Sequence, residues 1–259
     1  MCRLAAYLGE PVSLQAFLIE PPHSLYHQAW APEELRYAKL NADGYGFGWY
    51  DEAEAPLHYI NPAPIWNDPN LPALAKSLSS DLWIASVRSA TAGNPVNHVN
   101  TQPFADQSLL FDHNGFIANF HEQVKATFCH ELAPEFLSMV KGCTESEYLF
   151  ALLRQILDED QDSSLDEALQ EMVRRTEAML DDNPALLNFI VTDGNRIYAV
   201  RHAVGDDCPS LYLTTDDEQF PGAQLIASER MTHSDFWHPV PEHQILIIDP
   251  EEPPEFIDL

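Results

Sequence analysis

The most constraining feature of this sequence is a short run that is apolar at nearly every position. It covers residues 82–87 and reads Leu-Trp-Ile-Ala-Ser-Val. Successive side chains of a strand point to opposite faces, so a run without polar alternation has no face left for water. The run therefore predicts a strand in a sheet that is covered on both sides.

The remaining periodic segments follow the order strands, helices, strands. Apolar residues recur at helical spacing after two capping-box signals, Thr144 with Glu147 and Ser164 with Glu167. Before them, strands are expected at residues 4–8, 44–51, 82–88 and 109–112, with a long loop at 89–108. After them, strands are expected at 186–191, 196–200, 211–214, 224–227 and 244–248, the first two joined by a turn at Asp193-Gly194-Asn195. This order predicts an α+β layered architecture.

No internal repeat or low-complexity linker divides the 259 residues. We therefore expect a single domain over residues 2–250, which is long enough to bury a sizeable core. The Pro-Glu-rich stretch at the C-terminus predicts a solvated, acidic and Pro-rich tail at residues 251–259.

Charge and composition exclude several classes of function. The chain has 41 acidic and 13 basic residues, a formal charge of −28, which repels phosphate backbones and anionic lipids. We expect no nucleic-acid partner and no membrane partner. No apolar stretch is long enough to span a bilayer, and the N-terminal apolar run is too short for a signal peptide, so a cytoplasmic protein is expected. The cysteines and histidines show no metal-ligand spacing, so we expect no metal and no cofactor.

Cys2 is a candidate nucleophile because of its position alone. Methionine aminopeptidases remove Met1 when the next residue is small, and this would leave a thiol and a free α-amine on one residue. An α-amine titrates near pH 7.7–8.0, so it can act as general base for the neighbouring thiol. The alternative is that cysteine follows Met1 by chance.

Two further positions suggest a site for an anionic group. Arg88 ends the buried run, where a guanidinium can hold a carboxylate through two hydrogen bonds, and Thr91 adds a hydroxyl nearby. The alternative for Arg88 is a surface salt bridge. His113-Asn114-Gly115 follows the strand at 109–112 and is either a common hairpin turn or an oxyanion hole made by the Asn114 side chain and the Gly115 N–H.

Glycines alternate through Gly44-Tyr45-Gly46-Phe47-Gly48. The spacing does not match a dinucleotide fingerprint. Instead, it places the glycines on one face of a strand, where another backbone can pack closely.

The order of these motifs resembles the class II glutamine amidotransferase domain. The matching segments are Met1-Cys2-Arg3, Asn41 to Gly46, Arg88 to Thr91, Asn100 to Phe104, His113-Asn114-Gly115, Thr144 to Glu147 and Ala227-Ser228-Glu229. The N-terminal third is also similar to the stand-alone ergothioneine-biosynthesis amidohydrolases, which remove glutamate from a γ-glutamyl-cysteinyl-hercynine sulfoxide.

This resemblance implies a four-layer αββα sandwich of the N-terminal-nucleophile hydrolase type. It also implies roles: Cys2 as nucleophile and base, Asn114 and Gly115 as oxyanion hole, and Arg88 with Thr91 for the substrate α-carboxylate. Glu145 falls where the family usually has an aspartate that receives the α-ammonium, and Gln102 stands where many members have histidine.

Four functions remain open at this stage. The favoured one is a self-contained amidohydrolase acting on a small γ-glutamyl substrate, since no synthase sequence follows residue 259. The second is a glutaminase that delivers ammonia to a separate synthase. The third is a non-catalytic binding module, and the fourth is an acylase for another acyl group. The sequence leaves open whether the chain forms a homo-oligomer or binds a synthase partner.

Overall fold

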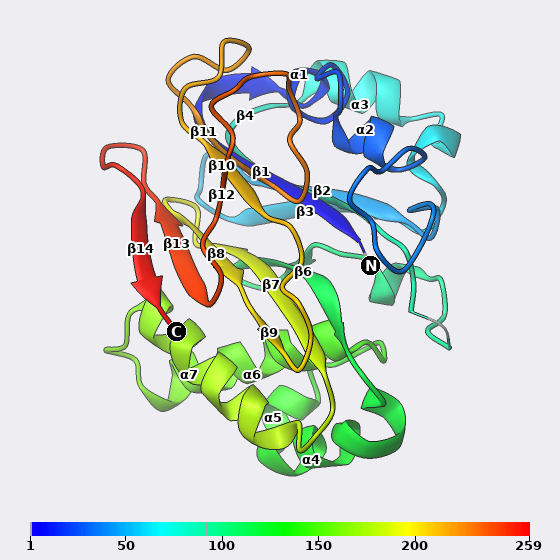
Figure 1. Ribbon diagram of the computed structural model, residues 1–259, viewed down its shortest axis with the longest axis vertical. Helices are drawn as coiled ribbons and strands as arrows, with labels where there is room; N and C mark the ends of the chain where they lie inside the picture. The colour runs from blue at the N-terminus through cyan, green and yellow to red at the C-terminus, as the bar shows by residue number, and fades with distance from the viewer. Residues whose placement is uncertain (1, 92) are drawn as a thin grey trace.

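Two antiparallel sheets packed face to face form the centre of the computed structural model, which describes residues 2–91 and 93–259. The first sheet has the order β12-β10-β11-β1-β4-β2-β3, and the second has the order β14-β13-β8-β7-β6-β5, with β9 paired to β7. Figure 1 shows the two sheets stacked between an upper and a lower layer of helices. The expected four-layer αββα sandwich of the N-terminal-nucleophile hydrolase type is therefore confirmed.

The strands of the first sheet are β1 (Arg3–Ser13), β2 (Tyr45–Tyr50), β3 (Pro56–Asn61), β4 (Ser79–Val87), β10 (Tyr212–Thr214), β11 (Gln224–Ala227) and β12 (His238–Pro239). Those of the second are β5 (Phe104–Ala105), β6 (Leu110–Ile117), β7 (Ala185–Thr192), β8 (Ile197–Arg201), β9 (Ala203–Val204), β13 (Gln244–Ile248) and β14 (Glu255–Asp258).

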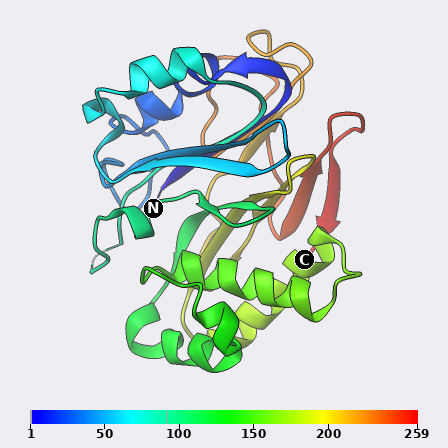
Figure 2. The same ribbon diagram turned by 180° about the vertical axis from the view of Figure 1, so that it is seen from behind.

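Short helices cover the first sheet, and the group that covers the second includes the two long helices α6 and α7 (Figure 2). The first group is α1 (Leu14–Leu18), α2 (Leu25–Gln28) and α3 (Leu71–Ser77). The second is α4 (Lys125–Glu131), α5 (Pro134–Leu137), α6 (Glu145–Glu159) and α7 (Leu165–Met179). Short 3-10 turns occupy Ile65–Asn67 and His98–Asn100, and a π-helical turn occupies Phe120–Val124. Within the described ranges, no helix is both long and apolar enough to cross a membrane.

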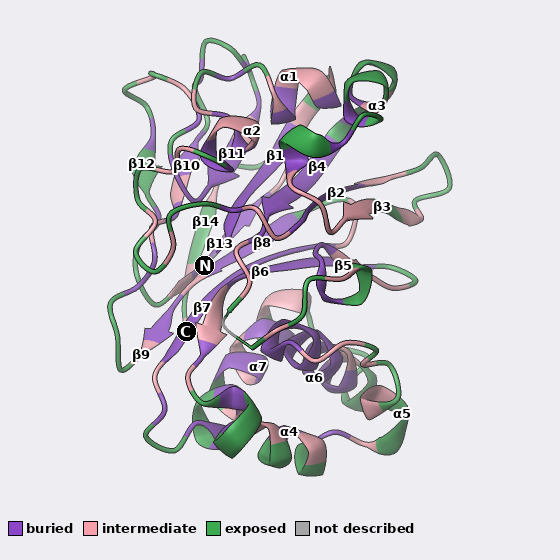
Figure 3. Cartoon of the chain, turned by 90° about the vertical axis from the view of Figure 1, so that its right-hand side faces the viewer, coloured by how far each residue is buried: buried purple, intermediate pink, exposed green. Residues whose placement is uncertain are grey.

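Three apolar clusters fill the spaces between the four layers. Leu4 and Ile84 point into the apolar layer between the two sheets. Their neighbours Ala5 and Trp83 point to the other face of the first sheet and pack under the short helices. This alternation explains the continuous apolar run, because β4 is buried on both of its faces. A third cluster joins the second sheet to α6 and α7. Figure 3 shows the buried strands enclosed by helices whose outer faces are exposed.

Two features predicted from short sequence motifs are present in the structure. The turn at Asp193-Gly194-Asn195 joins β7 to β8, with Gly194 at a φ of 97°. Gly44 directly precedes β2, and Gly46 and Gly48 lie in it. A Cβ at Gly46 would come within 2.2 Å of the Gln102 carbonyl oxygen. Close backbone packing, the interpretation favoured from the sequence, is therefore confirmed.

Two expectations about the ends of elements need correction. The Thr144 side chain makes no capping hydrogen bond at the start of α6, and Glu147 instead accepts the N–H groups of Lys141 and Gly142. In the segment expected to be a tail, the Pro-rich stretch is largely exposed, but β14 pairs with β13 and aligns Ile257 with Ile245. Edge pairing satisfies backbone groups that a free tail would leave to water.

Candidate active site

Cys2 lies directly before β1 and is 8% exposed. Leu4 and Ala6 point into the layer between the sheets, so the same alternation turns Cys2 toward that layer. Burial raises the pKa of the Cys2 thiol, while the Ser89 backbone and the Arg88 guanidinium act against the rise. The thiol is therefore protonated at rest and needs a base before it can attack.

A buried ion pair fixes the chain next to Cys2. Arg3 donates from Nε to the Cys2 carbonyl oxygen at 2.7 Å and from Nη1 to Glu229 Oε1 at 3.0 Å. Glu229 also accepts the N–H groups of Glu33 and Glu34 and contacts His23 Nε2 at 2.7 Å. Although burial opposes ionisation, these hydrogen bonds lower the pKa of Glu229 to about 2. Glu229 thus joins Arg3 to the segment at Glu33 and Glu34, a role that sequence analysis did not assign.

Asn114 and Gly115 lie inside β6, so the hairpin-turn interpretation of His113-Asn114-Gly115 is wrong. The Asn114 Nδ2 donates to the Ser228 hydroxyl at 3.2 Å, and Ser228 in turn accepts the N–H of Leu4 at 3.0 Å. This chain of contacts places the Asn114 amide next to the strand that begins after Cys2. At Gly115 a Cβ would come within 1.8 Å of the Leu186 carbonyl oxygen, so only glycine fits there.

Gln102 holds the backbone immediately before Asn114. Its Oε1 accepts the His113 N–H at 2.6 Å, and its Nε2 donates to the His113 carbonyl oxygen at 3.1 Å. The His113 ring points to the other side of β6 and contacts Ser146 and the Leu186 carbonyl oxygen. Burial lowers the pKa of His113 to about 4, so the ring is neutral and structural at physiological pH.

Arg88 is 5% exposed, which makes the surface-salt-bridge interpretation wrong. Its Nη1 lies 3.4 Å from the carbonyl oxygens of Asp43 and Pro95, and no carboxylate pairs with it among the described residues. The Asp43 carboxylate instead accepts the Ala90 N–H and holds the loop after β4. A buried guanidinium without a counter-ion can form hydrogen bonds to an anionic group.

Glu145, Thr91 and Asn94 line one pocket, together with residues at the end of β6 and at the start of the π-helical turn that follows it. Glu145 begins α6 and is 5% exposed. Burial raises the pKa of Glu145, and its own backbone N–H, Arg88 and Asn94 oppose that rise. The pocket therefore offers a buried acid near Arg88, on the side where Thr91 is exposed to solvent.

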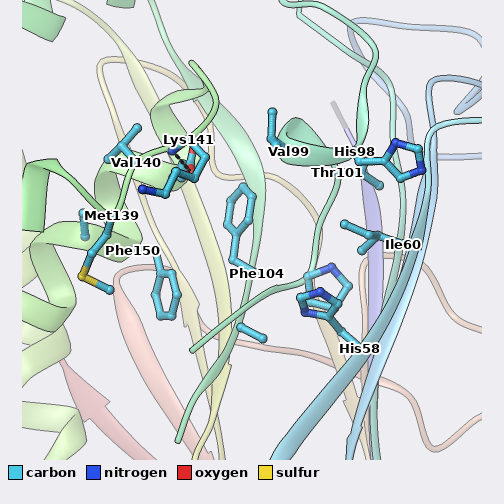
Figure 4. Close-up of a pocket in the computed structure, with 14 residues that line it drawn as sticks. His58, Ile60, His98, Val99, Thr101, Phe104, Met139, Val140, Lys141 and Phe150 are labelled. Carbon is cyan, nitrogen blue, oxygen red and sulfur yellow. Dashed lines mark hydrogen bonds between the residues drawn. The ribbon is translucent and has the colours of Figure 1, made fainter. Parts of the chain in front are cut away.

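A second pocket is more apolar and contains none of the predicted catalytic or substrate-binding residues (Figure 4). Phe104, Phe150 and Met139 line one side, and His58 and Ile60 of β3 line the other. This pocket therefore offers an apolar binding surface and does not contain the candidate nucleophile Cys2.

Potential metal ligands also occur away from Cys2. Ligand atoms of Cys208, Glu242 and His243 lie within 4.8 Å of one another. Arg201 already pairs with Glu242 at 3.2 Å. The expectation that the protein needs no metal stays a prediction.

The fold and the residues around Cys2 define a class of protein. A four-layer αββα sandwich with cysteine at position 2 and an Asn-Gly pair in the facing sheet is an N-terminal-nucleophile hydrolase arrangement. The family model for class II glutamine amidotransferases matches residues 24–248, and the chain belongs to that family.

Several known proteins are similar over nearly the whole chain. The probable glutamine amidotransferase DUG3 of Saccharomyces cerevisiae is 32% identical, over 96% of this chain and 82% of the yeast protein. The gamma-glutamyl-hercynylcysteine sulfoxide hydrolase of Mycolicibacterium smegmatis is 28% identical over 95% of both chains. A solved class-II glutamine aminotransferase domain protein from Silicibacter pomeroyi has a TM-score of 0.69 and 26% identity over 99% of both chains.

Proposed function

We propose that this chain hydrolyses a γ-glutamyl amide through a thioester at Cys2. The observation that carries the proposal is the placement of four groups at one end of the sandwich: the Cys2 thiol, the unpaired Arg88 guanidinium, the Asn114 amide and the Glu145 carboxyl group. Each is buried, so each acts in a medium where charges and dipoles are weakly screened.

The chemistry follows from what each group carries. Once Met1 is removed, the α-amine of Cys2 takes the thiol proton, and the sulfur attacks the amide carbon. Asn114 Nδ2 and the Gly115 N–H stabilise the oxyanion, and the α-ammonium returns the proton to the leaving amine. Water then attacks the thioester, releasing glutamate and regenerating the thiol.

Two oppositely charged side chains select the α-amino acid group of the γ-glutamyl substrate. Arg88 binds the α-carboxylate, and Thr91 contributes a hydroxyl beside it. Glu145 receives the α-ammonium. Bringing a cation beside the buried Glu145 favours its ionised form, which offsets the effect of burial on its pKa.

Among γ-glutamyl substrates, we propose γ-glutamyl-hercynylcysteine sulfoxide, the compound that names the mycobacterial relative. The proposal includes a cytoplasmic location, where the four free cysteines stay reduced. The alternative is a glutaminase that supplies ammonia to a separate synthase, and the yeast relative's name supports that alternative.

The test compares glutamate release by Met1-processed protein from the sulfoxide conjugate and from L-glutamine. We expect kcat/KM to favour the conjugate by at least about tenfold. A preference for glutamine with stoichiometric ammonia would support the glutaminase. No turnover of either, or turnover only of other acyl amides, would refute γ-glutamyl hydrolysis.

Arg88→Lys should lower kcat/KM about ten- to a hundredfold, because lysine cannot form the planar two-bond contact with a carboxylate. Glu145→Gln should cost a similar factor. Steady-state kinetics on the preferred substrate measure both, with Arg174→Lys on the exposed face of α7 as control. Unchanged kinetics in both Glu145→Gln and Glu145→Asp would remove Glu145 from the site.

A further inference from the structure

Two segments that flank strands of the second sheet bring metal-ligating atoms together. Cys208 lies in the loop after β9, and Glu242 and His243 lie immediately before β13. The Cys208 Sγ, a carboxylate oxygen of Glu242 and a ring nitrogen of His243 all lie within 4.8 Å of one another. Because the two segments are distant in the sequence, no metal-ligand spacing shows there. The tertiary structure alone brings these atoms together.

The chemistry of these three atoms fits zinc. A thiolate, an imidazole nitrogen and a carboxylate oxygen are all zinc ligands, at about 2.0–2.3 Å from the ion. Calcium and magnesium take oxygen ligands, whereas a thiolate selects a softer ion. The two anionic side chains, Cys208 and Glu242, would also balance the charge of one divalent cation. Small side-chain rotations would bring atoms this close into contact with a single ion.

A hydrogen-bonded array orients the ring of His243. Its Nδ1 lies 2.9 Å from His202 Nδ1, and His202 Nε2 lies 3.0 Å from Glu177 Oε1. When Nε2–H of a neutral His202 donates to Glu177, the Nδ1 atom of His202 accepts from Nδ1–H of His243. This tautomer leaves the Nε2 lone pair of His243 for a metal. A ligating histidine typically donates its other ring N–H to such a partner, which fixes the tautomer and the ring.

Backbone contacts hold both ligand segments in place. Arg36 Nη2 donates to the Cys208 carbonyl oxygen at 3.0 Å. His243 has a φ of 62°, in the left-handed region, and its N–H donates to the Arg201 carbonyl oxygen at 2.7 Å. The ion pair between Arg201 and Glu242 uses Oε1 of the carboxylate, at 3.2 Å. Glu242 can therefore keep this contact and present its second oxygen to a metal.

The candidate site lies between the interior and the surface. Cys208 is 2% exposed, whereas Glu242 and His243 are exposed. His202 and His243 line a pocket beside α7 and the C-terminal Leu259, through which an ion can reach them. The formal charge of −28 attracts divalent cations to the surface.

We propose that Cys208, Glu242 and His243 bind one zinc ion, with water as fourth ligand and His202 as a positioning residue. Zinc replaces the proton of the Cys208 thiol, which passes to solvent, and no oxidation state changes. The ion would tie the loop after β9 to the segment before β13. Its role is structural, because none of the candidate catalytic residues is a ligand. The inference does not depend on the proposed function, and it departs from the sequence-based expectation of no metal.

Metal titration tests the site directly. Untagged protein is stripped with a chelator, dialysed, and titrated with Zn²⁺ by calorimetry and with Co²⁺ by absorption spectroscopy. One equivalent of Zn²⁺ should bind with a Kd of about 1 µM or below. Co²⁺ should give a thiolate-to-metal charge-transfer band in the near ultraviolet. No binding in this range, or a Co²⁺ spectrum without the thiolate band, would overturn the proposal.

Variants of the ligands assign the band to this place. Cys208→Ala should remove the band and weaken Zn²⁺ binding by more than about a hundredfold. His243→Asn covers the case in which Cys208→Ala does not fold, because asparagine also tolerates a positive φ. It should weaken binding to a similar extent. An unchanged affinity in either variant would contradict the site.

His202→Asn tests the positioning role. It should weaken Zn²⁺ binding by about ten- to a hundredfold while the thiolate band persists at saturating Co²⁺, because the three ligands remain. An affinity equal to that of the wild type would remove His202 from the proposal.

Cys2→Ala is the matched control, because a processed N-terminal cysteine offers a thiol and an amine that also chelate soft cations. This variant should keep both the band and the affinity. Loss of both would place the ion at Cys2 and overturn the proposal. Excess Mg²⁺ should not displace Zn²⁺. Displacement would show a cation held only by the acidic surface, which would overturn the proposal as well.

Discussion

Cys2→Ala is expected to abolish hydrolysis, with kcat reduced by about 10⁴-fold or more, because no other group in the site can form the thioester. Cys2 is buried at the end of the inter-sheet layer, and alanine leaves only a small space there. The fold should therefore persist, as judged by circular dichroism and thermal unfolding. Steady-state glutamate release measures the loss.

Cys208→Ala is the matched control, since Cys208 is also buried but packs with Leu186 and Ala203 in a separate cluster. It should retain activity. In the wild type, the glutamine-like electrophile diazo-oxo-norleucine should alkylate Cys2 and spare Cys129, Cys143 and Cys208. Labelling mainly at one of these three would place the nucleophile elsewhere.

The same mechanism requires a free α-amine on Cys2. Intact mass should show that Met1 is lost from the expressed protein. A fusion that blocks the amine should be nearly inactive until a protease exposes Cys2, because an amide nitrogen cannot accept the thiol proton. Full activity of the blocked form would refute the role of the amine.

Asn114→Ala is expected to lower kcat by about 10²–10³, with a smaller change in KM. The Asn114 amide acts on negative charge that develops on the substrate oxygen in the transition state, so its loss affects the reaction more than substrate binding. Kinetics at saturating and limiting substrate separate the two parameters. A change confined to KM would make Asn114 a ground-state binding residue.

Asn114 also donates to Ser228, so a purely structural role has to be tested separately. Ser228→Ala removes that contact and leaves the Asn114 amide in place. It should reduce kcat much less than Asn114→Ala does. Equal losses would mean that Asn114 acts by holding β6 to the strand after Cys2 rather than through an oxyanion hole.

Much of the fold was predictable because local patterns decide it. The apolar run of β4, the turn before β8 and the amphipathic residues of α6 and α7 depend on neighbours in sequence. The short helices α1 to α3 and the strand β3 were missed, since their few residues show no sustained period. Their stability comes from packing on the first sheet.

The sequence by itself determined the α+β order of elements through its hydrophobic periodicity. It also determined the family, because Cys2, Arg88 and Asn114-Gly115 occur in a recognisable order. Only the tertiary structure decided that Arg88 is buried and that Asn114 belongs to a strand rather than a turn. It also revealed Glu229, which pairs with Arg3 across 226 residues. The physical reason is that burial and long-range pairing fix the charge and hydrogen bonding of a side chain, and neither can be read from its neighbours in sequence.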